Sequence, residues 1–196
     1  SLSQDKSADP KETLRRETNA TWMAFLFAGA LTFSAVDWMM TLDPEWYSTI
    51  FGVYFFAGSA VAALAYMIIV LMVLQSRGLL RGVVNVEHFH DYAKLMFGFT
   101  CFWAYIAFSQ YFLIWYANIP EETKFFLVRQ GGQALETNWP YVSLALIAGC
   151  FVLPFVGMMA RSIRRNRNLL FGWAVFLLAM RYLDMYWVIR PSYQPD

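Results

Sequence analysis

The stretch that decides the fold is residues 33–56, FSAVDWMMTLDPEWYSTIFGVYFF, which joins two long apolar segments through a short acidic and aromatic turn. Asp37 lies inside the end of the first segment, and Asp43 and Pro44 begin the turn. A run of about 20 apolar residues spans the hydrocarbon core of a bilayer. The stretch therefore indicates a hairpin of two membrane-spanning helices, with a carboxylate placed where lipid makes it costly.

The composition of the whole chain supports the same class. Its 196 residues are 59% hydrophobic and 15% charged, with a mean hydropathy of +0.41, which indicates an integral membrane protein. A net charge of +1 gives no sign of nucleic-acid binding. Cys101 and Cys150 lie in apolar runs without a CxxC pattern, which favours packing over a metal or redox site. The chain lacks an initiator Met and a secretory signal pattern, so we expect it to be part of a longer chain.

Five segments approach the length of a membrane span, which predicts an all-α polytopic bundle. They are residues 22–40, 49–74, 92–119, 139–160 and 169–189. A polar lead-in, residues 1–21, precedes them, and residues 191–196 follow. The connection at 117–138 is expected to be a loop with a short surface helix, and Pro154 is expected to bend the fourth segment.

The distribution of Lys and Arg predicts the orientation, because these residues favour the cytoplasmic side. Eleven of the 15 basic residues fall on the side of the lead-in and three on the other. This places residues 1–21 in the cytoplasm and the turn at 41–48 outside. It also places five of the eight tryptophans near the outer interface, namely Trp38, Trp46, Trp115, Trp139 and Trp187.

Charged residues at membrane depth are candidates for chemistry, because they are costly there and usually face the bundle interior. Arg181 and Asp184 are three residues apart in the fifth segment, so they share a helix face and can pair. They form either a structural ion pair or a titratable gate. Asp37 is either an interfacial carboxylate or part of a polar cavity.

A second polar group opens the third segment. His90, Asp91 and Lys94 cluster by spacing at its cytoplasmic end, and Tyr105 and Ser109 continue the polar face. This arrangement suggests a proton path into the bundle. The alternative is a solvated helix start, since an acidic residue near a helix N-terminus is favourable.

The residues give no support for a redox centre within the chain. The only histidines, His88 and His90, are separated by a single residue at a helix start, whereas a b-type haem needs axial ligands deep in a bundle. We expect no catalytic residue, no metal site and no bound cofactor here, so an electron carrier would be a diffusible quinone or would belong to a partner.

Three stretches, in order, resemble one family: FSAVDWMMTLDPEWYSTIFGVYFFAG, DYAKLMFGFTCFWAYIAFSQYFLIWYANIPEET and LDMYWVIRP. They resemble the NrfD/polysulphide-reductase-like membrane subunits, most closely the ActF-type subunit of bacterial alternative complex III, a quinol:cytochrome c/electron-acceptor oxidoreductase of respiration or photosynthesis. The resemblance covers nearly the whole chain. It implies a subunit with about twice as many helices, of which this chain would be the C-terminal half or another part.

The resemblance also implies a location and partners. The location is the bacterial inner membrane, with residues 41–48 and 191–196 in the periplasm. The partners are lipid, a sister NrfD-like membrane subunit, an iron–sulphur/molybdopterin-like subunit and cytochrome c subunits, with no nucleic acid. Quinol or menaquinol is the expected substrate, and haem c and Fe–S clusters are expected only in partner subunits.

Three hypotheses follow. The first is a redox-complex membrane subunit without chemistry of its own, in which buried polar residues form an inner and an outer half of a proton path. The inner half contains His90, Asp91, Lys94, Tyr105 and Ser109, and the outer half contains Asp37, Arg181 and Asp184. The second is a quinol site near the outer leaflet, formed by Asp37, Trp38, Trp46 and Tyr47. The third is a purely structural anchor, which predicts paired charges and no polar cavity.

Overall fold

The protein is an all-helical bundle. The structure, a computed structural model, describes residues 10–44, 46–80, 82–131 and 138–193, so the first nine residues of the lead-in and the last three of the C-terminal end lie outside the described residues. Within the described residues five helices are long and apolar enough to cross a membrane, and no strand occurs. The predicted fold class, a polytopic helical membrane bundle, is confirmed.

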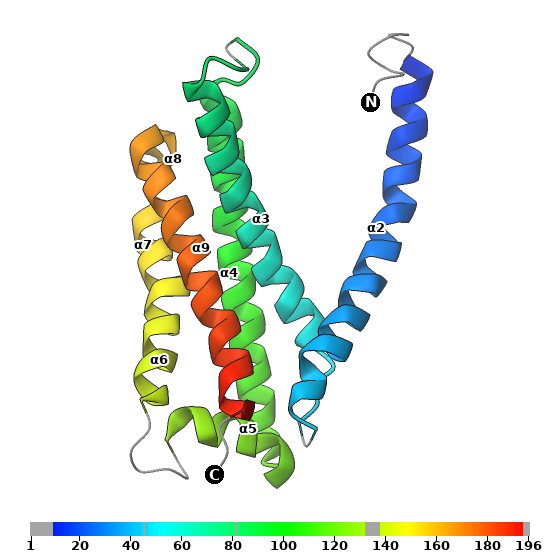
Figure 1. Ribbon diagram of the computed structural model, residues 1–196, viewed down its shortest axis with the longest axis vertical. Helices are drawn as coiled ribbons and strands as arrows, with labels where there is room; N and C mark the ends of the chain where they lie inside the picture. The colour runs from blue at the N-terminus through cyan, green and yellow to red at the C-terminus, as the bar shows by residue number, and fades with distance from the viewer. Residues whose placement is uncertain (1–9, 45, 81, 132–137, 194–196) are drawn as a thin grey trace.

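The helices alternate in direction between two ends of the bundle (Figure 1). In chain order they are α2 (Pro10–Trp38), η1 (Met40–Leu42), α3 (Phe51–Ser76), α4 (Val86–Ala117), α5 (Pro120–Gln130), α6 (Trp139–Leu146), η2 (Ile147–Val152), α7 (Leu153–Met159), α8 (Arg161–Arg165), α9 (Arg167–Ile189) and η3 (Arg190–Tyr193). We call the end with α5 and the α2–α3 turn the α5 end, and the opposite end the α8 end.

Two helices begin earlier than the hydropathy predicts. The first helix begins at Pro10 rather than at residue 22, because the polar lead-in continues it and Pro suits the first helical position. The third begins at Val86 rather than at residue 92, because Asn85 caps it. The Asn85 side chain accepts a hydrogen bond from the His88 amide at 3.1 Å, and the His88 ring accepts one from the Asn85 amide, which completes a capping box.

The fourth predicted segment is interrupted where Pro154 predicts irregularity. The π-helical turn η2 separates α6 from α7, and Pro154 occupies the second position of α7. Pro has no amide hydrogen for the carbonyl group of the preceding turn, so a regular α-helix cannot continue through this point. A π-helical turn accommodates the missing hydrogen bond by adding one residue to the turn.

The compact part of the bundle consists of α3, α4, α9 and the α6–α7 unit (Figure 1). Small residues on α3, including Ala57, Gly58 and Ala65, are buried and allow α9 to approach closely. One core cluster lies towards the α5 end around Trp103 and Phe125. A second lies towards the α8 end and contains no residue of α2.

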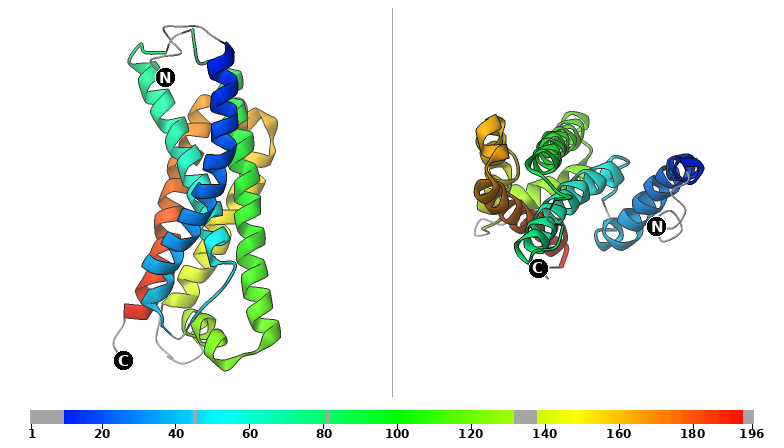
Figure 2. Two further views of the ribbon diagram at one scale, coloured as in Figure 1. Left: turned by 90° about the vertical axis from the view of Figure 1, so that its right-hand side faces the viewer. Right: turned by 90° about the horizontal axis from the view of Figure 1, so that it is seen from above.

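Helix α2 stands apart from the other spans. It leans away from α3 towards the α8 end, and the view along the bundle shows it outside the group formed by the other helices (Figures 1 and 2). Only 6% of its spanning window is buried. Its close approach to α3 is near their shared turn, where Gly52 leaves room for Thr32. The candidate site therefore lies among the other four spans.

Candidate functional site

A buried polar network joins α3 and α9 in the membrane-spanning part of the bundle. Arg181 donates a hydrogen bond from Nη2 to Oδ2 of Asp184 at 2.5 Å, and the Tyr54 hydroxyl donates to Oδ1 of the same carboxyl group. The exposed fractions of Tyr54, Arg181 and Asp184 are 5%, 6% and 1%. Both oxygens of one deeply buried carboxyl group therefore have a protein partner, as a charged residue at this depth requires.

Two further residues fix the Arg181 guanidinium. Its Cζ atom lies 4.9 Å from the ring centroid of Trp103, within the range of a cation–π interaction. The guanidinium also lies against Gly58, where a Cβ atom would come within 3.0 Å of three of its atoms. The absence of a side chain at residue 58 therefore creates the space that Arg181 occupies. Tyr54 and Gly58 are four residues apart and present one face of α3 to this network.

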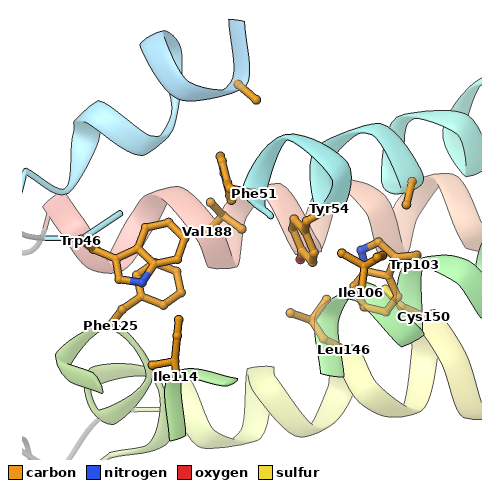
Figure 3. Close-up of a cluster of buried hydrophobic side chains, with 12 residues drawn as sticks. Trp46, Phe51, Tyr54, Trp103, Ile106, Ile114, Phe125, Leu146, Cys150 and Val188 are labelled. Atoms are coloured by element: carbon orange, nitrogen blue, oxygen red, sulfur yellow. The ribbon is translucent and has the colours of Figure 1, made fainter. Parts of the chain in front are cut away.

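A cavity of about 690 Å³ opens beside the network, towards the α5 end. Tyr54 and Asp184 are part of its wall, and most of the remaining wall is aromatic or aliphatic. Figure 3 shows several of these side chains gathered between α3, α4, α5 and α6. The volume lies in the range typical of small-molecule pockets, which are mainly apolar with a few placed polar groups.

The wall at the α5 end is built around Phe125. The Trp46 ring stacks on it, with a centroid separation of 4.0 Å and an interplanar angle of 15° (Figure 3). The guanidinium of Arg129 covers it, with Cζ 3.4 Å from the ring centroid. The α2–α3 turn and α5 are thus joined through a stack of two rings and one cation.

Arg129 also binds the C-terminal end of α9. It donates hydrogen bonds from Nε to the carbonyl of Trp187 at 3.2 Å and from Nη2 to that of Val188 at 2.9 Å. These carbonyls belong to the last turn of the helix, where a cation is favourable. Burial lowers the pKa of Arg129 to about 9, and the negative charge of Asp43 opposes the change. The guanidinium therefore remains charged at neutral pH.

A serine extends this junction to α6. The Ser143 hydroxyl donates to the carbonyl of Arg129 at 3.0 Å and accepts a hydrogen bond from Nε1 of Trp187 at 2.8 Å. These polar contacts connect helices α5, α6 and α9 at the α5 end of the cavity. Ser143 and Trp187 also contribute to the cavity wall. The short helix predicted within 117–138 is α5, but it is not simply a surface element, because Phe125 and Arg129 are buried.

The structure separates the residues predicted for the outer half. Arg181 and Asp184 form the predicted pair, whereas Asp37 has an exposed side chain on α2 and no ion pair with a described residue. Among the predicted quinone residues, Trp46 is in the cavity wall. Trp38 and Tyr47 are 79% and 61% exposed, and neither is part of that wall.

The residues predicted for the inner half also lie in different environments. Asp91 and Lys94 form an ion pair of 2.7 Å on the exterior of α4, and their side chains are more than half exposed. His90 is buried. Tyr105 is 65% exposed at the cavity wall, and Ser109 is half-buried. No continuous polar chain of described side chains joins His90 to the Asp184 network.

The sequence reasoning missed Tyr54, Trp103 and Arg129. Tyr54 is four residues before Gly58, so the two lie on one face of an apolar helix. A glycine on such a face lets a neighbouring helix come close, and the Tyr54 hydroxyl can then bond to a polar group of that helix. Trp103 is one of the three tryptophans not predicted near the outer interface, which points to a position inside the bundle. Arg129 offered no such signal, because a cation in a loop is usually solvated.

The described residues contain no group of three or more His, Cys, Asp or Glu side chains placed to hold a metal ion. Comparisons of the chain with protein-family models and with curated proteins return no match.

Proposed function

We propose that this chain is a membrane subunit of a quinol:electron-acceptor oxidoreductase of the alternative complex III type. In this subunit Asp184 accepts and releases protons at the cavity wall. The resemblance of its sequence to NrfD-like subunits supports the class of complex. The observation that carries the role is a buried carboxyl group that forms part of an aromatic cavity wall while bound to Tyr54 and Arg181.

The arrangement suits proton transfer for two reasons. An ionisable group inside a membrane protein is costly and is commonly retained along a proton or ion route. Asp184 also has a neighbour, the Tyr54 hydroxyl, that can both donate and accept hydrogen bonds. Arg181 donates a hydrogen bond to the other oxygen of the same carboxyl group, so Tyr54, Asp184 and Arg181 form one connected polar network at the cavity wall.

A second function, quinol binding in this chain, is favoured by the cavity itself. Its volume of about 690 Å³ and its aromatic wall suit the ring of a quinol such as menaquinol. Oxidation of one quinol releases two electrons and two protons. The electrons would pass to the Fe–S or haem c centres of partner subunits. Asp184 would accept one proton from a ring hydroxyl, and the other proton would leave to the aqueous phase at the α5 end.

The alternative of a purely structural anchor accounts for fewer of these features. It predicts that buried charges are paired and that they adjoin no polar cavity. Arg181 and Asp184 are paired, as this alternative predicts, but it gives no role to the cavity that Asp184 and Tyr54 help to line. Partners remain part of the proposal: the sister NrfD-like subunit, the iron–sulphur/molybdopterin-like subunit and the cytochrome c subunits would surround this chain in the membrane.

The test uses the assembled complex in liposomes, with quinol oxidation and proton release measured together. Asp184→Asn is expected to lower both, because it removes a proton acceptor while nearly preserving shape. Tyr54→Phe is expected to lower proton release more weakly. Glu121→Gln, an exposed acid of α5 outside the cavity, is the matched control and should leave both unchanged. Wild-type values in Asp184→Asn and Tyr54→Phe would refute the proposal.

The two functions are separated by quinol affinity. If quinol binds in the cavity, Trp46→Ala should raise the KM for quinol several-fold with little change in kcat, because Trp46 contributes to the wall without bonding to Asp184. An unchanged KM in this variant, together with lost proton release in Asp184→Asn, would leave the proton-path function and exclude the quinol site.

A further inference from the structure

The α8 end carries a concentration of positive charge at the junction of α4, α7 and α8. Arg165 pairs with Glu87, and Lys94 pairs with Asp91. Three more arginines follow each other closely in the chain, namely Arg161, Arg164 and Arg167, and none of them forms an ion pair with a carboxylate of the described residues. The junction therefore has an excess of positive charge that its own acidic residues do not neutralise.

Arg164 is held in place but incompletely bonded. Its Nη1 donates to the carbonyl of Met158 at 3.0 Å, and its Cζ lies 5.5 Å from the ring centroid of Phe97. Its Nε is buried and has no hydrogen-bond partner. The guanidinium is thus fixed against α4 and α7 while its buried Nε–H has no partner, which costs free energy unless an acceptor occupies the position.

His90 is the second incompletely bonded group. It is 8% exposed, and its Nδ1 is buried without a partner. The cations whose charges reach its ring are Lys94 on the next turn of α4 and Arg161, Arg164 and Arg165 on α8. A ring nitrogen in this position can donate a hydrogen bond to an anion that the surrounding cations attract. Asp91, the carboxylate that also interacts with the charge of His90, is itself paired with Lys94.

The surface next to the arginines, within the apolar span, is aromatic and aliphatic. Phe97 of α4 and Phe155 of α7 stack with a centroid separation of 5.8 Å and an interplanar angle of 23°. Phe155 is 37% exposed, and Val156 and Met159 on the same helix are 64% and 59% exposed. An anion bound at Arg164 would therefore lie directly beside apolar surface that can contact a hydrocarbon chain.

We propose that the junction of α4 and α8 binds the phosphate group of an anionic phospholipid. The phosphate oxygens accept hydrogen bonds from Arg164 Nε and His90 Nδ1, Arg161 adds charge at the rim, and an acyl chain follows the Phe97–Phe155 pair. The excess of positive charge favours a lipid with net negative charge over a zwitterionic one. The adjoining apolar surface favours a lipid over free phosphate. Basic pockets between spanning helices bind such head groups in other membrane proteins.

The test measures lipid selectivity of the full-length purified protein in liposomes by electron paramagnetic resonance. Spin-labelled phosphatidylglycerol and phosphatidylcholine are compared, and the protein-associated fraction gives a relative association constant. The wild type is expected to prefer phosphatidylglycerol several-fold. Arg164→Gln should lower this preference about fivefold, which corresponds to about 1 kcal/mol for one cation near an anionic lipid. His90→Phe, which removes the ring nitrogens, should lower it less.

Two further variants keep the test decisive. Arg161→Gln is expected to fold, because Arg161 is exposed and has no packing role in the described contacts. It should weaken the preference for phosphatidylglycerol even if Arg164→Gln does not fold. Arg77→Gln is the matched control: it removes one exposed cation at the same end of the bundle but on another loop, and should leave the preference unchanged.

Three results would overturn the proposal. One is an equal loss of preference in Arg77→Gln and Arg164→Gln, which indicates a diffuse charge effect. Another is wild-type preference in Arg161→Gln, Arg164→Gln and His90→Phe. The third is full displacement of phosphatidylglycerol by millimolar inorganic phosphate, which would assign the junction to free phosphate.

Discussion

The contact between Gly58 and Arg181 makes a strong prediction about Gly58→Ala. A methyl group at residue 58 would come within 3.0 Å of three guanidinium atoms. Ordinary van der Waals contact begins near 3.5 Å, so the Arg181 guanidinium would have to move away by roughly 1 Å or more. Arg181 cannot retreat freely, because the Asp184 carboxyl group and the Trp103 ring hold it.

The size of the effect follows from opposing contributions. Inserting one methyl group into a packed site costs about 1–3 kcal/mol. Loss of the buried ion pair between Arg181 and Asp184 would raise the cost towards about 3–5 kcal/mol. The higher helix propensity of Ala relative to Gly stabilises the folded state by at most about 1 kcal/mol, which offsets part of this cost. We expect Gly58→Ala to lower the free energy of unfolding by about 2 kcal/mol.

The assay is reversible unfolding in mixed micelles of detergent and dodecyl sulfate, followed by circular dichroism. Gly98→Ala and Gly172→Ala are matched controls in α4 and α9, because a Cβ atom at either position has no atom within 4 Å. Both should be neutral or stabilising. In an Arg181→Ala background Gly58→Ala should cost almost nothing. An equal cost in the presence and absence of the Arg181 side chain would refute the reasoning.

Three further predictions use the same unfolding assay. Asn85→Ala should lower the free energy of unfolding by about 1 kcal/mol, because it removes the acceptor of the His88 amide at the start of α4; an unchanged value would mean that the cap contributes nothing. Arg129→Met should cost about 2–3 kcal/mol, since it leaves carbonyls at the end of α9 without their charged donor, and a stabilised variant would contradict this. Gly157→Ala should cost about 1–3 kcal/mol and shift the fluorescence of Trp173, because a Cβ atom would come within 3.0 Å of three atoms of that ring; unaltered fluorescence would show that the ring adapts without displacement.

The spans could be predicted from sequence because apolar length is a local property. All five predicted segments correspond to candidate membrane spans. The starts of α2 and α4 could not be predicted from hydropathy, since polar residues extend both helices beyond their apolar parts. The start of α4 depends on the hydrogen bond between the Asn85 side chain and the His88 amide rather than on hydropathy.

The candidate site could be predicted only where its contacts are local. Arg181 and Asp184 are three residues apart, so helical spacing was sufficient to predict their pairing. Tyr54, which completes the network, is 130 residues from Asp184, and no spacing rule reaches across that distance. Asp37 has the reverse problem: it lies near a conspicuous turn, but its side chain is on the exposed face of α2, whereas Ala35 two residues earlier is buried.

The π-helical turn at Ile147–Val152 has a consequence for how this chain is compared with others. One extra residue rotates everything beyond it by about 100° relative to an uninterrupted α-helix. A related chain without the turn would therefore align with a gap of a single residue at this point. If the gap were omitted, Phe155 and the exposed face of α7 would be matched with side chains that point into the bundle, and a membrane-facing position would be read as a core position.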